Sequence, residues 1–309
     1  MPNNLPMAIL GDTGMEVTSL GFGAMEIRGA PRGRAVTPAQ AETILNAVLD
    51  SGINYIDTSI DYGRSEEFIG QFISGRRDEY FLASKCGCQV GAAPAPAGQR
   101  SPHVFTRENV ITGVEQSLRR MKTDYLDVVQ FHSSPSKSVM EADGGLDALR
   151  ELQQQGKVRH IGMSGVLPEL AEHVAMGDFR VLQIPYSALE RQNEEWISRA
   201  ASSGIGAVIR GGVAKGEPGQ SGVSRPQGWA LFEEAKLDDL LEEGESRTAF
   251  MLRFTLSHPG MRTTIVGTLN PDHLAQNVAT ASKGSLSDEV YEEAKRRLAA
   301  AGEVPAKAA

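Results

Sequence analysis

The chain alternates between short apolar segments and longer amphipathic segments along almost its whole length. The apolar segments have the length and composition of buried strands, and the amphipathic ones have helical spacing. We expect strands over residues 19–24, 54–59, 79–87, 124–132, 158–165, 180–187, 206–212 and 262–268. We expect helices over 37–52, 65–75, 106–121, 138–157, 167–177, 193–204, 246–260 and 270–282. Strands that alternate with helices pair in parallel, and about eight such units favour a closed (β/α)8 TIM barrel.

Two further segments flank the repeating pattern. Residues 7–20 alternate around Gly-Asp-Thr-Gly, which predicts an N-terminal β-hairpin, and residues 287–301 predict an additional C-terminal helix. No change of composition marks a domain boundary, so we expect one barrel domain over residues 1–309, with a flexible tail from about residue 302. An open doubly wound sheet is the alternative, but no Gly-x-Gly-x-x-Gly motif leads from the first strand into a helix.

The charge and apolar content exclude several classes of function. The net charge of -8 argues against nucleic acid and anionic membranes as partners. No apolar run approaches the ~20 residues that span a membrane, and the N-terminus has no basic segment before a long apolar one. We therefore expect a cytoplasmic protein. The two cysteines, Cys86 and Cys88, are expected as reduced thiols, and a Cys-x-Cys pair has too few ligands for a structural zinc site, so we expect no metal.

Polar side chains follow the apolar part of nearly every expected strand. In a barrel these strand ends meet at one mouth, where catalytic groups gather. The residues are Asp57 with nearby Tyr62, Lys85, His132, Ser164, Gln183 with Tyr186, Arg210 and Thr268. One polar residue at a strand end is ordinary, and His132 alone has an equal claim to being a hydrogen-bonded core histidine. Convergence of Asp, Tyr, Lys and His from three consecutive strands favours an active site.

These four residue types suit one kind of proton transfer. The phenol of tyrosine has a pKa near ~10, and a neighbouring ammonium favours its ionised form. A carboxylate such as Asp57 keeps Lys85 charged and in place, and His132 can orient a carbonyl oxygen. The set is suited to protonating a carbonyl oxygen while another group supplies hydride.

Six segments in order resemble the aldo-keto reductase superfamily. "INYIDTSIDYGRSEEFIG" is similar to that family's signature, "LASKCG" to its lysine strand and "YLDVVQFHS" to its histidine strand. "KVRHIGMSG", "LQIPYSALER" and "TTIVGTLNPDHLAQN" resemble its later strands. The resemblance covers nearly the whole chain. It implies an oxidoreductase in which Tyr62 is the general acid or base, Lys85 lowers its pKa, Asp57 holds Lys85 and His132 positions the carbonyl.

The resemblance also implies a nicotinamide cofactor site. Ser164 and Gln183 match residues that hold the carboxamide, although the family's usual Ser-Asn pair is Ser164-Gly165 here. Arg210 replaces a tyrosine that stacks on the nicotinamide ring in many relatives, and a guanidinium can also stack. The full expected set is Gly23, Met25, Ser164, Gln183, Arg210, Gly267, Thr268, His273, Gln276 and Asn277.

The identity of the cofactor depends on the adenosine end. Relatives that prefer NADP(H) commonly place a lysine and an arginine where this chain has Gly267 and His273. Losing two cations weakens 2′-phosphate binding at ~1.5–3 kcal/mol for each charged hydrogen bond. Lys215 and Arg225 in the segment 211–228 can compensate if it folds over the cofactor. Members of the family generally prefer NADP(H), so we favour NADP(H), with NAD(H) or dual use as the alternatives.

Other readings remain open at this stage. Lys85 in a Schiff-base aldolase is one, but the nearby Asp57 disfavours the uncharged lysine that this chemistry needs. A reductase-like regulatory subunit that binds the cofactor is another. We expect a small carbonyl or alcohol substrate and a monomer or weak homo-oligomer. The long segments 87–105 and 211–228 are expected to cover the pocket, Tyr186, Met25 and Trp229 to pack, Asp61 to be a solvent-exposed carboxylate, and Ser65 to cap a helix.

Overall fold

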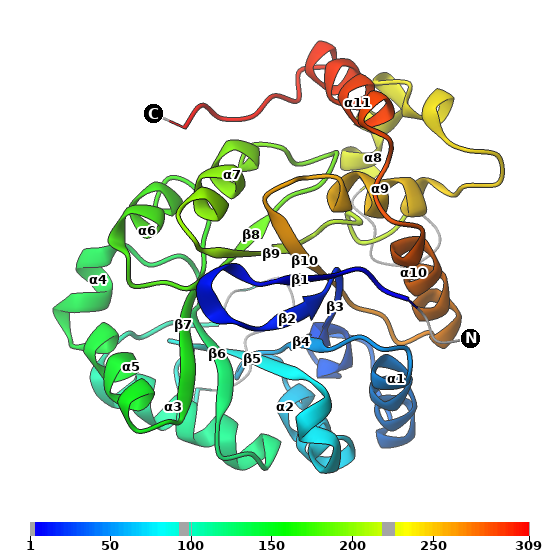
Figure 1. Ribbon diagram of the computed structural model, residues 1–309. Helices are drawn as coiled ribbons and strands as arrows, with labels where there is room; N and C mark the ends of the chain where they lie inside the picture. The colour runs from blue at the N-terminus through cyan, green and yellow to red at the C-terminus, as the bar shows by residue number, and fades with distance from the viewer. Residues whose placement is uncertain (1–3, 93–98, 100, 218–225, 309) are drawn as a thin grey trace.

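Eight parallel strands close into a barrel, which confirms the predicted fold (Figure 1). The computed structural model describes residues 4–92, 99, 101–217 and 226–308, without the side chains of 226–228. In order around the barrel the strands are β10 (Met261–Val266), β3 (Leu20–Gly23), β4 (Tyr55–Asp57), β5 (Phe81–Cys86), β6 (Leu126–Phe131), β7 (Val158–Ser164), β8 (Val181–Pro185) and β9 (Gly206–Arg210). The pairing of β10 with β3 and β9 closes the ring.

Helices surround the barrel as an outer ring (Figure 1). They are α1 (Pro38–Asp50), α2 (Ser65–Phe72), α3 (Arg107–Met121), α4 (Lys137–Ala142), α5 (Gly145–Gln154), α6 (Leu170–Met176), α7 (Glu194–Ser202), α8 (Pro226–Glu234), α9 (Arg247–Leu256), α10 (Pro271–Lys283) and α11 (Asp288–Ala300). Short 3-10 helices add η1 (Gly11–Thr13), η2 (Ala24–Arg28), η3 (Ser74–Glu79) and η4 (Leu237–Leu240). No helix in the described part of the chain is long and apolar enough to cross a membrane.

Local sequence explains where the helices begin. Thr37 and Gln40 form a capping box at α1, and Asn270 caps α10, whose first residue is a proline. The expected cap at Ser65 is wrong. Ser65 lies inside the first turn of α2, and its hydroxyl instead donates to the carbonyl of Ala24 and contacts the hydroxyl of Thr58. This contact fixes the start of α2 against the end of β3.

One expected helix and one expected loop differ from the structure. Residues 138–157 form two helices, α4 and α5, because Gly144 between them has a φ of 73°. The segment 211–228 was expected as one long loop, but α8 begins at Pro226 and continues to Glu234. Trp229 on α8 is buried and its ring packs against Phe232, so it belongs to the core as expected.

The predicted hairpin closes one end of the barrel. β1 (Met7–Ile9) and β2 (Glu16–Thr18) pair antiparallel and lie across the barrel in the view of Figure 1. Leu10, Met15 and Val17 pack inward against Tyr55 and Val208, so the barrel is filled at this end. The carboxyl ends of the strands open at the other end, where the polar residues lie.

The C-terminal helix packs back on the barrel. Tyr186 at the end of β8 is fully buried and shares a 2.8 Å hydrogen bond with Tyr291 of α11. The side chain of Glu303 accepts a hydrogen bond from the backbone N–H of Arg191, and the N–H of Ala306 donates to the carbonyl of Gln192. The chain after α11 is therefore attached to the loop that precedes α7.

Candidate active site

The structure brings the four predicted catalytic residues together at the carboxyl ends of β4, β5 and β6. The ammonium of Lys85 donates to the carboxylate of Asp57 at 2.5 Å and to the carbonyl of Thr58 at 2.7 Å. Its Nζ lies 5.0 Å from the centre of the Tyr62 ring. The His132 ring lies edge-on to Tyr62 at 6.2 Å between centres. Tyr62 therefore lies beside a cation and an imidazole.

Two amides hold the other oxygen of Asp57. Gln130 of β6 and Gln183 of β8 each donate to Oδ2 of this carboxylate at 2.8 Å. Asp57 thus receives three donors from three strands, and all four side chains are buried. Gln183 was expected to contact the cofactor, and here it also supports the ion pair. Gln130 was missed, although it lies two residues before His132 and so on the same side of the strand.

Lys85 is held in its charged form. Burial alone would lower the pKa of the Lys85 ammonium, but the charge and hydrogen bond of Asp57 outweigh burial and raise it. A lysine that forms a Schiff base must lose its proton near neutral pH. The direction of this shift favours a permanent cation beside Tyr62 and disfavours the aldolase reading.

Burial dominates the protonation of Tyr62. Burial raises the pKa of the Tyr62 phenol, and the charges of Lys85 and Arg210 oppose this without reversing it. We expected Lys85 to lower this pKa, and Lys85 does act in that direction, but the net shift is upward. The phenol therefore holds its proton near neutral pH, which suits a general acid.

His132 is neutral and lies beside a second carboxylate. Burial and the charge of Lys85 lower the pKa of the His132 imidazole to about 3. Its Nδ1 lies 3.8 Å from the carboxylate of Asp61. The expectation of an exposed Asp61 is wrong, because its side chain is only 10% exposed and accepts hydrogen bonds from Ser59 and Arg32.

A tight turn presents Tyr62. The N–H of Tyr62 donates to the carbonyl of Ser59, and its own carbonyl accepts from the N–H of Ser65. Gly63 follows with a φ of 48°, and a Cβ built there would lie 2.2 Å from the carbonyl oxygen of Arg28. Glycine is therefore required both by the backbone conformation and by the close approach of the chain after β3.

The predicted cofactor residues lie on the remaining arc of the barrel mouth. Ser164 ends β7, Gln183 lies in β8 and Arg210 ends β9. The Ser164 hydroxyl donates to the amide oxygen of Gln183 at 3.4 Å. Gly23 ends β3 and half-buried Met25 lies in η2, next to the end of β10. The predicted catalytic residues and the cofactor candidates therefore occupy neighbouring arcs of one ring.

The residues expected at the adenosine end surround the start of α10. Gly267 follows β10, and a Cβ there would lie 2.4 Å from the carbonyl oxygen of Gly23. The hydroxyl of Thr268 accepts the N–H of Asn270. His273, Gln276 and Asn277 follow at spacings of three and four residues, which is one face of the helix. Lys215 precedes the undescribed segment, and Arg225 lies outside the described residues.

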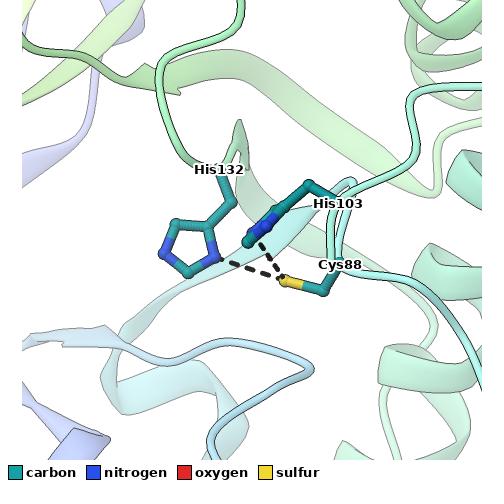
Figure 2. A group of neighbouring side chains, drawn as sticks. All are labelled: Cys88, His103 and His132. Carbon is teal, nitrogen blue, oxygen red and sulfur yellow. Dashed lines mark hydrogen bonds between the residues drawn. The ribbon is translucent and has the colours of Figure 1, made fainter. Parts of the chain in front are cut away.

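The segment 87–105 follows β5 as an arm of the chain. Its residues Cys88 and His103 lie beside His132, a contact that the sequence did not predict. Its backbone pairs Cys88 with His103 as an antiparallel bridge. Figure 2 shows the thiol of Cys88 pointing at both His103 and His132. Its sulfur lies 3.2 Å from Nδ1 of His132 and 3.6 Å from Nε2 of His103. Burial and the charge of Asp61 raise the pKa of Cys88 to about 12, so the group is a thiol. Cys86 is also free, as expected.

Known proteins resemble this chain in sequence and in fold. The profile of the Aldo/keto reductase family matches residues 19–298. Pyridoxine 4-dehydrogenase of Escherichia coli is 30% identical over 89% of this chain and 92% of its own. The "Uncharacterized oxidoreductase YqkF" of Bacillus subtilis is 29% identical over 91% and 92%. The holo form of aldo-keto reductase AKR11C1 from Bacillus halodurans superposes with a TM-score of 0.82, at 27% identity, over 99% of this chain and 98% of its own. The chain belongs to the aldo/keto reductase family and is an NAD(P)-dependent oxidoreductase.

Proposed function

We propose that the protein reduces the carbonyl of a small aldehyde or ketone to an alcohol, or runs the reverse reaction, with Tyr62 as the proton donor or acceptor. The main support for this proposal is that Tyr62 lies beside both Lys85 and His132. The pKa shifts favour a protonated Tyr62, a charged Lys85 and a neutral His132. The segments that carry these residues resemble the signature, lysine and histidine strands of the family to which the chain belongs, which supports the proposal.

Each side chain has one role in the proposed reduction. The nicotinamide cofactor, when bound, supplies the hydride that adds to the carbonyl carbon. Tyr62 transfers its phenolic proton to the carbonyl oxygen, which becomes the hydroxyl of the product. Lys85 stabilises the phenolate that remains, and Asp57 keeps Lys85 in position. His132 donates a ring N–H to the carbonyl oxygen, which orients the substrate. In oxidation the same proton returns to Tyr62.

The groups at the mouth fit a nicotinamide carboxamide. Because the amide nitrogen of Gln183 donates to Asp57, its oxygen faces Ser164 and can accept an amide N–H. Ser164 supplies a hydroxyl for the carboxamide oxygen. Arg210 lies close enough to influence the pKa of Tyr62, which supports its proposed position against the nicotinamide ring. These contacts serve NADP(H) and NAD(H) equally.

We favour NADP(H) over NAD(H), with dual use as the alternative. The common preference of the family supports NADP(H), and Lys215 lies in the loop that begins at the mouth, after the end of β9. Asp272 in the first turn of α10 weighs in the other direction because it adds a negative charge near the expected phosphate. Titration of the protein with NADPH and with NADH in a calorimeter tests this choice. Tighter binding of NADH by more than about tenfold, or ~1.4 kcal/mol, would overturn it.

The names of two relatives support the substrate class. Pyridoxine 4-dehydrogenase of Escherichia coli and L-galactose dehydrogenase of Arabidopsis thaliana, which is 24% identical over 90% of this chain, are named for small hydroxylated molecules. An alcohol and carbonyl pair on a small polar molecule is therefore the class we propose. The sequence expectations of a cytoplasmic setting and of a monomer or weak homo-oligomer stay proposals.

Turnover by the wild type and by one variant tests the proposed chemistry. The protein is mixed with NADPH and a panel of aldehydes and ketones, and the loss of NADPH absorbance is followed. We expect turnover by the wild type and its loss in Tyr62→Phe, which keeps the ring but has no proton to give. Cofactor binding should survive in the variant. Tight cofactor binding without turnover of any substrate in either direction would contradict the catalytic proposal and favour a regulatory subunit. Equal rates in the variant would exclude Tyr62 as the acid.

A further inference from the structure

We propose that Cys88, His103 and His132 form a binding site for a single borderline-soft divalent cation such as Zn²⁺. In the part of the chain that the structure describes, one ligand atom from each of these residues lies within 4.8 Å of the others (Figure 2). One thiolate and two imidazoles are ligands that Zn²⁺ prefers, and three protein ligands with an open fourth position are the pattern of catalytic rather than structural zinc sites.

Two of the three separations between ligand atoms lie close to those of a tetrahedral ion. Bond lengths of about 2.3 Å for Zn–S and 2.0–2.1 Å for Zn–N place sulfur and nitrogen about 3.5–3.6 Å apart in a tetrahedron. The sulfur of Cys88 lies 3.6 Å from His103 Nε2 and 3.2 Å from His132 Nδ1. The first separation already matches, and the second requires a change of a few tenths of an ångström. The rings of His103 and His132 are nearly perpendicular, with centres 5.0 Å apart, and their ligand nitrogens lie within 4.8 Å of each other. Two Zn–N bonds in a tetrahedron require about 3.3–3.4 Å between the nitrogens, so the two imidazoles adjust to this separation when an ion binds.

The backbone holds these ligands in place before any ion binds. Cys88 and His103 face each other across a bridge, with Val104 N–H donating to the Gly87 carbonyl on one side and Gln89 N–H to the Pro102 carbonyl on the other.

Asn109 strengthens this arm, because its side chain donates to the carbonyls of both Cys88 and Val104. His132 is tied to the same strand end by its N–H, which donates to the Cys86 carbonyl. Cys88 is 1% exposed, whereas the side chain of His132 is 18% exposed, so an ion reaches the thiol from the mouth.

Binding would release one proton and would fix the tautomer of His132. The thiol of Cys88 loses its proton to solvent when the sulfur becomes a ligand. Coordination through Nδ1 of His132 leaves the ring proton on Nε2, at the opposite edge of the ring from Cys88 (Figure 2). The metal site and the proposed carbonyl contact would then use the two nitrogens of one imidazole. This link to catalysis rests on the proposed function, but the site itself does not.

Co²⁺ in place of Zn²⁺ gives a readout that needs no turnover. Thiolate bonded to Co²⁺ produces a charge-transfer band in the near ultraviolet, and a tetrahedral ion absorbs strongly in the visible. The full-length protein, free of any histidine tag, is titrated with Co²⁺ and then with Zn²⁺, which should displace it. We expect one ion per chain, a thiolate band, and release of a proton. Because neither cofactor nor substrate is present, failure of the proposed reductase chemistry would not affect this result.

Matched variants decide whether these residues hold the ion. Cys88→Ser should remove the thiolate band, and His103→Gln should weaken binding by more than about tenfold, since even residues that only support ligands are worth about 10–100-fold. Cys86→Ala and His160→Gln change the same residue types outside the site and should leave binding unchanged. Thermal melting of each variant checks folding. An absent band in the wild type, or a band that persists in Cys88→Ser, would overturn the proposal and leave a thiol that only forms hydrogen bonds.

Discussion

Asp57 carries its charge inside the barrel, where an unpaired carboxylate is costly. Lys85 neutralises it on one oxygen, and the amides of Gln130 and Gln183 occupy the other. A buried ion pair is weak evidence for stability, but removal of one partner leaves an uncompensated charge. The four side chains are therefore best understood as one unit that keeps a cation next to Tyr62.

This unit makes a prediction about Lys85→Met. The variant leaves the Asp57 carboxylate without its cation and should lower the free energy of unfolding by about 3–5 kcal/mol. Adding Asp57→Asn should restore most of this loss, because the amide still accepts and carries no charge. Equilibrium unfolding in guanidinium chloride, followed by circular dichroism, measures both variants.

Lys157→Met gives the matched control for the loss of a lysine. Lys157 pairs with Glu115 at 2.9 Å, but both side chains are at least 35% exposed, so its loss should cost about 0–1 kcal/mol. A double variant as unstable as Lys85→Met alone, or equal losses in Lys85→Met and Lys157→Met, would contradict the account of Asp57.

The sequence indicated some of these contacts and gave no sign of others. Asp57, Lys85 and His132 follow apolar strands, and strand ends converge in a barrel, so their meeting was predictable. Gln130 was also within reach, because alternation in a strand places it on the side of His132. The contact between Cys88 and His103 was not predictable, because these residues lie 15 positions apart in a segment whose sequence has no helix or strand periodicity. The burial of Asp61 depends on Arg32, which is 29 residues distant.

Capping residues are present at some helix starts and absent at others, as α1 and the failed cap at Ser65 show. Thr37 caps α1 and Gln40 reaches back to the N–H of Thr37, as the pattern Thr-Pro-Ala-Gln predicts. We predict that Thr37→Ala lowers the free energy of unfolding by about 0.5–2 kcal/mol. Ser136 precedes α4 but makes no capping bond, so Ser136→Ala should stay within about 0.5 kcal/mol. Chemical unfolding compares the two, and an equal loss in both would argue against the capping box.

The turn between β4 and α2 makes a prediction that joins backbone and activity. Gly63→Ala places a methyl group 2.2 Å from the Arg28 carbonyl, so the turn must move and carry Tyr62 with it. A displacement of about 1 Å costs about 10²-fold in rate, and we expect a loss of that size in kcat/KM.

Gly156→Ala is the control that separates backbone strain at a positive φ from displacement of Tyr62 by a steric clash. Gly156 has a φ of 76° and nothing within 4 Å of a built Cβ, so its substitution should cost about 1–2 kcal/mol of stability through the backbone alone. Activity should not change. If Gly63→Ala retains full activity in the same aldehyde assay, the turn does not determine the position of Tyr62.

The sequence pattern did not predict two boundaries between elements, the break between α4 and α5 and the start of α8. Residues 138–157 were expected as one helix weakened by Gly144-Gly145, and the structure divides them at Gly144, where the backbone of Gly145 approaches the Phe105 carbonyl too closely for a Cβ. Residues 211–228 are rich in glycine, proline and serine, which obscured the helix that begins at Pro226. That helix is stabilised by burial of Trp229 and Phe232 rather than by local propensity.

Closure of the whole molecule joins segments that are far apart in sequence. β10 meets β3 to complete the ring, and α11 returns to cover β8 through Tyr291 and Tyr186. The order of strands and helices predicted this barrel because each unit is locally readable and parallel crossovers have one hand. The contacts of α11 with α7 were not predictable, because both helices carry many charges and only the folded arrangement selects the pairs.

A buried ionic cluster between α7 and α11 predicts how the stability of the protein depends on pH. Glu194 on α7 accepts from Arg191 at 2.7 Å and from Lys295 of α11 at 3.1 Å, and its side chain is 10% exposed. Burial alone would raise the pKa of the Glu194 carboxyl, but these two cations outweigh burial and lower it. The unfolded chain therefore binds a proton at higher pH than the folded protein does. The resulting stability is present above the ordinary glutamate pKa of about 4.3 and is lost as the pH falls through the depressed value.

Glu194→Gln should remove this dependence. Near neutral pH the variant should have a lower melting temperature than the wild type, and the difference should shrink steadily as the pH falls below about 4.3, because the wild type then loses the same charge. Glu42→Gln removes one charge from the exposed face of α1 and controls for the change in net charge. Melting curves over a pH series measure all three proteins. If the difference between Glu194→Gln and the wild type were the same at every pH, the contact between α7 and α11 would act through packing, and the ionic cluster would not contribute to closure.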